Sequence, residues 1–173
     1  MIAVINASPL IYLSKLGIIE ILPQLFSRIV TTQTVKEEVL QEKTAPEHII
    51  LTEVFESWLE VEKVKEKLVE KLEELQIHKG EAEVIALGRE LLAKEKTAVV
   101  IIDDLLAREI ATSLGLIVTG TIGILLKATK EKVFSIKESQ TLLAQLITTT
   151  TTTFRLSAKV YAKILKEIEG LEK

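Results

Sequence analysis

Residues 99–104 have the sequence VVIIDD, a short apolar run that ends in two adjacent carboxylates. Four β-branched residues in succession are typical of a strand buried on both faces, as in the parallel sheets of α/β proteins. Such sheets bind their ligands beyond the carboxyl ends of the strands. We therefore expect Asp103 and Asp104 to lie at the edge of the sheet where a ligand binds.

The composition limits the classes of protein to consider. A chain of 173 residues is long enough for one domain with a substantial core. Apolar residues make up 47% of it but aromatic residues only 4%, so the core must be built from Leu, Ile and Val. The absence of cysteine excludes disulfides, thiolate metal sites and cysteine nucleophiles. Abundant Glu and Lys, with single Met and Asn residues, resemble the composition of thermophile proteins.

Charge and hydropathy bear on location and partners. The N-terminus lacks the features of a signal peptide, and no apolar stretch reaches membrane-spanning length. We expect a cytoplasmic protein with no membrane contact. The formal net charge of −3 gives no general affinity for nucleic acid, which would need a local basic patch or bridging metal ions.

Strand-like and helix-like segments alternate along the chain. Residues 2–5 repeat the apolar run, 28–32 and 116–118 are shorter candidates, and 58–61 alternates like an edge strand. The order strand, helix, strand indicates right-handed crossover units. We therefore predict an α/β protein with a mainly parallel sheet, folded as one domain.

Apolar residues recur at helical spacing between these strands. Ser8 is expected to cap the first helix, with Pro9 as its first residue, and Gly80 to break the chain before a later helix. The run of threonines at 148–153 is expected to be non-helical and is assigned no function. The predicted helices are 9–16, 18–25, 34–40, 46–56, 62–74, about 81–91, 106–114, about 121–128, 137–146 and 157–168.

Carboxylates gather at the predicted carboxyl edge of the sheet. Asp103 and Asp104 end one strand, Glu38 lies on the helix after another, and Glu81 and Glu83 open a helix that can point to the same place. Clustered carboxylates repel one another unless a positive charge neutralises them. Ligands that are all oxygen favour Mg²⁺ or Mn²⁺ over Zn²⁺. Metal-assisted hydrolysis of a phosphodiester is the default use of such a site, with nucleic acid as substrate.

An ordered set of motifs across residues 1–130 resembles the PIN-like domains, with the VapC-like toxins of prokaryotic toxin–antitoxin pairs as the nearest subgroup. The motifs are NASPLI at 6–11, EEV at 37–39, GEAEVIAL at 80–87, IDD at 102–104 with Arg108, and TGT at 119–121.

This resemblance implies a three-layer α/β/α sandwich around a sheet of about four to five strands. It assigns residues 1–173 to one nuclease domain, with the core motifs in 1–130 and C-terminal helices in 137–169. It further implies an RNA-cleaving enzyme that uses Mg²⁺ or Mn²⁺, a cognate antitoxin protein and a homodimer.

The resemblance also assigns roles to particular residues. The acidic positions of the family fall on Asn6, Glu38, Glu81 or Glu83, and Asp104, which become the predicted catalytic and metal-binding residues; Asp103 remains a further metal ligand candidate. Ser8, Arg108, Thr119 and Thr121 are the remaining candidates, as residues that support the site or contact phosphate.

The family usually has Asp at the position of Asn6. Asn can ligate a hard cation through its carbonyl oxygen, but it adds no negative charge and cannot act as a base. The alternative function is therefore a PIN-like module that has lost catalysis and still binds RNA or a partner. A phosphate-accepting receiver domain is a third class, but it requires its acidic pair after the first strand, where this chain has Asn6.

Several candidates also have simpler structural interpretations. Side chains diverge at the end of a strand, so only one of Asp103 and Asp104 is expected to bind metal; we favour Asp104 and expect Asp103 to cap the next helix. Arg108 is expected to form an ion pair with Asp104, four residues before it. Glu37 is expected to be solvated, and His78 to be an ordinary surface or partly buried residue.

Overall fold

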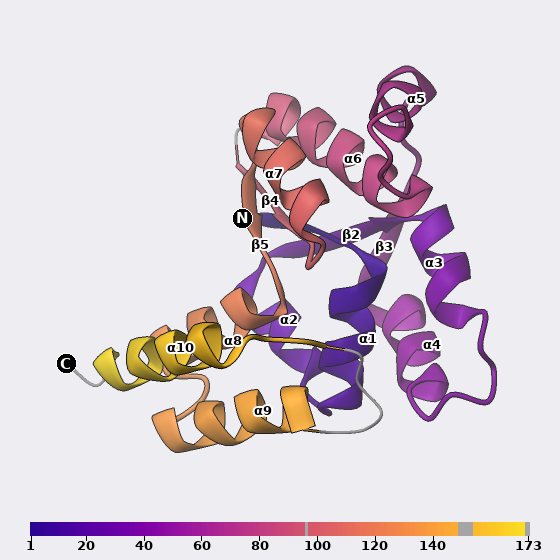
Figure 1. The fold of residues 1–173 in the computed structure, drawn as a ribbon. Helices are drawn as coiled ribbons and strands as arrows, with labels where there is room; N and C mark the ends of the chain where they lie inside the picture. Colours follow the sequence, from indigo (N-terminus) through magenta and orange to yellow (C-terminus); the bar gives the residue numbers. More distant parts are fainter. Residues whose placement is uncertain (96, 149–153, 172–173) are drawn as a thin grey trace.

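The computed structural model describes residues 1–95, 97–148 and 154–171 (Figure 1). Its centre is a sheet of five parallel strands in the order β3-β2-β1-β4-β5. Helices cover both faces, with α5, α6 and α7 on one side and α1, α2, α4 and α8 on the other (Figure 1). The strands are β1 (Ile2–Ile5), β2 (Arg28–Thr32), β3 (Leu59–Glu62), β4 (Ala98–Ile101) and β5 (Ile117–Thr119).

The predicted three-layer α/β/α sandwich is confirmed. β1 is the middle strand, where Ala3 lies beside Ile29 of β2 and Val99 of β4. Both faces of β1 are covered, and Val4 and Ile5 are fully buried, which explains why its sequence does not alternate between polar and apolar residues.

The helices connect the strands as crossover units, and the last two, α9 and α10, extend the fold beyond the sheet (Figure 1). Leu143 of α9 and Ile164 and Ile168 of α10 form a second, smaller apolar cluster that packs on side chains of α8. The helices are α1 (Ala7–Lys15), the 3₁₀ helix η1 (Ile19–Ile21), α2 (Leu22–Leu25), α3 (Gln33–Leu40), α4 (His48–Ser57), α5 (Glu66–Glu73), α6 (Lys79–Glu95), α7 (Leu105–Ser113), α8 (Thr121–Lys130), α9 (Ile136–Thr148) and α10 (Ala158–Gly170).

Several predicted helix starts are wrong: the helix predicted from 62 begins at Glu66, because Glu62 ends β3, and the helix predicted from 46 begins at His48. Two further errors concern helices that start near the cleft. α1 begins at Ala7 and not at Pro9, so Ser8 is inside the first turn and Asn6 is the residue before the helix. α6 begins at Lys79, so Gly80 does not break the chain but is the second residue of the helix. In both cases the chain turns from extended to helical earlier than the capping pattern indicates.

The threonine run falls mostly outside the described residues. Thr148 is the last residue of α9, contrary to the expectation for this position, and 149–153 are not described. Among the described residues, no helix combines the length and apolar character needed to cross a membrane.

Candidate active site

A cleft of about 350 Å³ opens at the carboxyl ends of β1 and β2. One side chain comes from the residue directly after β1, one from the first turn of α1, two from α3, and the remainder from the start of α6. The lining residues are Asn6, Ser8, Thr34, Glu38, His78, Lys79, Gly80 and Glu81. The structure thus brings together the predicted residues Asn6, Ser8, Glu38 and Glu81 in one cleft.

Asn6 contributes an unpartnered oxygen to this cleft. Its residue is only 5% exposed, and its Oδ1 is buried without a hydrogen-bond partner. The side chain does not cap α1, while the backbone N–H donates to the carbonyl of Ile101 in β4 at 3.0 Å. A buried acceptor without a donor costs about 1–3 kcal/mol. The position of Asn6 Oδ1 is therefore suited to an electropositive ligand, which would remove this cost.

Gly80 leaves the space in which the oxygens of Asn6 and Glu38 face each other. A Cβ atom at this position would lie 3.4 Å from Glu38 Oε2 and 3.7 Å from Asn6 Oδ1. Both oxygens therefore border the same small volume above the backbone of α6. Glycine at this position keeps the volume open for a ligand.

Glu81 is the carboxylate on which the other acidic residues, Glu38 and Asp104, act. Its Oε2 accepts a hydrogen bond from the backbone N–H of His78 at 3.0 Å, which is the return half of a capping box at the start of α6. Partial burial raises the pKa of the Glu81 carboxyl, and the Asp104 and Glu38 carboxylates raise it further, against the opposing effect of His78. Glu38 and Asp104 are therefore each close enough to repel the carboxylate of Glu81.

Glu38 is positioned by α3. The helix begins after Thr32, whose hydroxyl accepts from the backbone N–H of Val35 at 3.4 Å. Partial burial raises the pKa of the Glu38 carboxyl, while the neighbouring His78 lowers it. Glu37 is exposed and accepts from Gln33 Nε2 at 2.8 Å, as expected of a solvated residue.

The roles of the two adjacent aspartates differ from the prediction. Asp104, not Asp103, is the N-cap of α7, and its Oδ1 accepts from the backbone N–H of Ala107 at 2.8 Å. Asp103 accepts from Thr121 instead, from the N–H at 2.8 Å and from the hydroxyl at 2.6 Å. Both oxygens of Asp103 are thereby engaged in joining the end of β4 to the start of α8.

The sequence of the chain matches the model of a known protein family. The model is described as a PIN domain, and it matches residues 2–170. The chain belongs to the PIN-domain family. The PIN domain is a nuclease fold, so the family points to a nuclease-type hydrolase. No curated protein matches the chain.

The other predicted residues of the PIN domain lie outside the cleft. Arg108 lies beside Asp103, where its charge lowers the pKa of that carboxyl against the larger, raising effect of burial. A Cβ atom on Gly120 would lie 3.3 Å from Arg108 Nη1 and 2.6 Å from Asp103 Oδ1, so these groups crowd the same turn. The electrostatic partner found for Arg108 is thus Asp103 and not the predicted Asp104. The Thr119 hydroxyl packs against Gly123 of α8.

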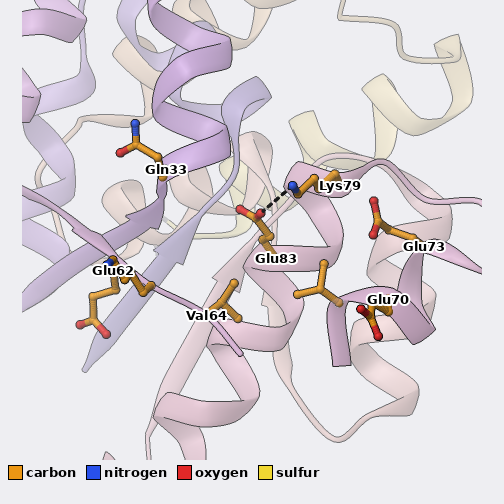
Figure 2. Close-up of a pocket in the computed structure, with 9 residues that line it drawn as sticks. Gln33, Glu62, Val64, Glu70, Glu73, Lys79 and Glu83 are labelled. Carbon is orange, nitrogen blue, oxygen red and sulfur yellow. Dashed lines mark ion pairs between the residues drawn. The ribbon is translucent and has the colours of Figure 1, made fainter. Parts of the chain in front are cut away.

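Glu83 points into a second hollow beside the cleft, where it faces Lys79 (Figure 2). Its carboxylate is buried, accepts from Thr34 Oγ1 at 2.8 Å and lies 4.0 Å from Lys79 Nζ. Glu81 and Glu83 are two residues apart on α6, so their side chains leave the helix in different directions. Glu81 therefore lines the cleft, and Glu83 supports two residues that line it.

The sequence interpretation missed four residues that line the cleft, namely Thr34, His78, Lys79 and Gly80. His78 was expected to be an ordinary residue, yet it lies at the N-terminal end of α6 and lines the cleft with Glu38 and Glu81. Its place directly before the Lys79-Gly80-Glu81 segment was the available signal, because residues at a helix start near the carboxyl edge of a sheet face the ligand site.

The donor atoms suit a hard divalent cation. The unpartnered Asn6 Oδ1 and the carboxylates of Glu38 and Glu81 are oxygen ligands, the type that Mg²⁺ and Mn²⁺ prefer. The part of the chain that the structure describes nevertheless holds no group of three or more His, Asp or Glu side chains arranged to bind a metal ion. Asn6 falls outside that count because its donor is an amide oxygen, so it would add a third oxygen ligand to those of Glu38 and Glu81.

We expect the metal-free protein to lose stability as pH rises through the range in which Glu81 ionises. Because the folded-state pKa of Glu81 is raised, the folded protein binds more protons than the unfolded chain there. Glu81→Gln keeps an acceptor for the His78 N–H and removes the charge. Its free energy of unfolding, relative to the native protein, should rise between pH 4 and neutrality, about the range above the usual carboxyl pKa.

Urea denaturation with a chelator present, repeated across this pH range, measures the difference. Glu37→Gln on the exposed side of α3 is the matched control and should follow the native curve. A Glu81→Gln curve parallel to the native one at every pH would contradict the assigned repulsion.

Proposed function

We propose that this PIN-domain protein is a metal-dependent endoribonuclease that hydrolyses phosphodiester bonds of RNA. The observation that carries the proposal is the buried, unpartnered Asn6 Oδ1 in a cleft shared with Glu38 and Glu81. Mg²⁺ or Mn²⁺ would be held by Asn6, Glu38, Glu81 and Asp104. When bound, the ion supplies polarisation of the phosphodiester and activation of water.

The residues of the chain contribute charge and position. Glu38 and Asp104 both repel the carboxylate of Glu81, and a cation in the cleft would relieve this repulsion. Capping bonds at two helix starts fix Glu81 and Asp104. Gly80 has no side chain, so the space beside Asn6 Oδ1 and Glu38 Oε2 stays open to a ligand.

The resemblance to VapC-like proteins supports a finer proposal, in which the protein is the toxin of a toxin–antitoxin pair. Its partners would then be RNA, a cognate antitoxin protein and a second copy of the chain. The antitoxin would inhibit by occupying the acidic cleft. Co-purification with the product of a neighbouring reading frame, and loss of RNA cleavage in that complex, would test this part.

The test of the central proposal is cleavage of a structured RNA by the purified protein. We expect cleavage with Mn²⁺ or Mg²⁺, loss of cleavage when a chelator removes the ion, and recovery when the ion is returned. Cleavage that persists in the chelator would contradict metal dependence. No cleavage of any RNA with either ion would contradict the nuclease assignment.

A second candidate function is a PIN-domain module that binds RNA or a partner without cleaving. The neutral Asn6 favours it, because a carboxylate there would add charge to the ligand set. We expect Asn6→Asp to raise the affinity for Mn²⁺ about tenfold, since ligand charge sets the affinity of oxygen sites. Calorimetric titration measures the affinity, and the RNA assay is run alongside.

The two candidate functions differ in what the native protein does. If only Asn6→Asp cleaves RNA, the binding module is correct and the natural chain is inactive. Full activity of the native protein excludes that candidate. Asn6→Asp with unchanged affinity for Mn²⁺ would contradict the place of residue 6 in the metal site.

A further inference from the structure

The cleft is acidic, whereas the proposed substrate is an anion. RNA carries a negative charge at every phosphate, and its affinity for proteins depends on Lys and Arg contacts to those phosphates. Two side chains that line the cleft, His78 and Lys79, can carry positive charge. Lys79 supplies a positive charge at neutral pH, because ammonium groups lose their proton only far above that pH.

Lys79 lines both the cleft and the second hollow, and Figure 2 shows it in the second hollow opposite Glu83. Its side chain is 62% exposed, so the ammonium can reach a ligand in solvent. The second hollow has several further carboxylates, among them Glu62, Glu70 and Glu73, with Lys63 as its other cation. These carboxylates repel a phosphate, whereas a cation in the cleft would offset the charges of Glu38 and Glu81, so a phosphate at Lys79 would favour the cleft side.

Glu83 holds Lys79 at this boundary. Its Oε1 accepts from Thr34 Oγ1 at 2.8 Å and lies 4.0 Å from Lys79 Nζ, one turn earlier on α6. Glu83 is 8% exposed and accepts a hydrogen bond from the Thr34 hydroxyl, whereas the Lys79 side chain is largely exposed. A buried anchor with an exposed cation is an arrangement that orients the ammonium without blocking its outer side.

We propose that Lys79 binds a phosphate of the RNA at the mouth of the cleft, and that Glu83 is the positioning residue that keeps the ammonium there. This inference rests on the proposed function for the identity of the substrate. It assigns Glu83 to the support of a substrate contact rather than to the metal.

The first experiment compares RNA affinities of the full chain without catalysis. Fluorescence anisotropy of a labelled single-stranded RNA is measured with a chelator present, at several salt concentrations. We expect Lys79→Gln to weaken binding about fivefold at low salt, as for an exposed charge contact. The slope of log affinity against log salt should become shallower by about 0.7, the value for one lost phosphate contact to a single strand.

Two further variants serve as controls, one that restores the charge at position 79 and one that removes a charge elsewhere on α6. Lys79→Arg should bind RNA as the native protein does, because it restores the charge. Lys94→Gln changes the same charge near the other end of α6, and it should leave affinity and slope unchanged. Equal affinities of the native protein and Lys79→Gln, or equal losses in Lys79→Gln and Lys94→Gln, would overturn the phosphate contact.

Glu83→Gln tests the positioning role in a double-mutant cycle. The amide keeps an acceptor for Thr34 Oγ1 and loses the attraction to Lys79. If Glu83 orients Lys79, the loss of affinity from Lys79→Gln should shrink from about fivefold to about twofold in the Glu83→Gln background. A loss that is unchanged or larger would overturn positioning, because it would mean that Glu83 acts independently or competes with RNA for the lysine.

The binding experiment and the cleavage experiment distinguish failure of this inference from failure of the nuclease proposal. If the native protein cleaves no RNA with Mn²⁺, the nuclease proposal fails, and the anisotropy series still decides the role of Lys79. If cleavage is seen and the Lys79 variants bind as the native protein does, only this inference fails. In an active protein Lys79→Gln should raise KM with little change in kcat, since binding is lost and the acidic residues are intact.

Discussion

Asp104→Asn should lower the rate of RNA cleavage by about 10²–10³-fold and leave the fold intact. The variant removes one negative charge from the acidic set, and a metal ion in such a site contributes several kcal/mol of transition-state stabilisation. Asn is about as good an N-cap as Asp, so the bond to the Ala107 N–H and the start of α7 are preserved. The rate is measured with Mn²⁺ under single-turnover conditions.

Two further variants separate the helix cap that Asp104 forms from the role in metal binding that we propose for it. Asp104→Ala loses the cap as well and should cost about 1 kcal/mol of stability in addition to activity. Glu109→Gln removes a charge from the exposed side of the same helix and should cleave at the native rate. Native cleavage by Asp104→Asn would remove Asp104 from the metal site and leave it as a helix cap only.

Asp103→Ala should lower the free energy of unfolding by about 2 kcal/mol, the largest stability effect expected at this edge of the sheet. The N–H and hydroxyl of Thr121 are buried, and both donate to Asp103. Removing the carboxylate leaves two donors unpaired, each at about 1–3 kcal/mol. Burial raises the pKa of Asp103, so relief of this unfavourable burial offsets part of the loss.

Urea denaturation at neutral pH measures the change. Asp103→Asn keeps one acceptor and should lose about half as much stability, whereas exposed Glu37→Ala should stay within about 0.5 kcal/mol of the native protein. Unchanged stability of Asp103→Ala would contradict the structural role of the Thr121 contacts. The position would then be open again to a role in metal binding.

Most of the fold could be predicted from the sequence because the central strands β1 and β4 are apolar and buried on both sides. The segments 2–5, 28–32 and 58–61 were predicted within one residue of β1, β2 and β3. An uninterrupted apolar strand between helical segments has few alternatives to a parallel sheet covered by helices. The helix starts at Ala7 and Lys79 could not be located in this way, because capping residues fit several neighbouring positions.

Only part of the candidate site could be predicted from the sequence. The carboxyl ends of parallel strands meet at one edge, and this rule correctly placed Asn6, Glu38 and Glu81 near one another. It could not assign Asp103 and Asp104, since the hydrogen bonds of adjacent residues at a strand end depend on partners far along the chain. Thr121, which holds Asp103, is one such partner.

The sequence by itself thus determined the layers of this protein and the edge of the sheet at which its polar residues gather, because hydrophobic pattern and chain order act locally. Only the tertiary structure decided which of those residues share the cleft. It placed Glu81 inside the cleft and Glu83 in the neighbouring hollow, and it placed His78 and Lys79 beside Asn6. The physical reason is that side-chain direction at a helix start depends on the packing of α6 against α3 and the sheet, which no local pattern records.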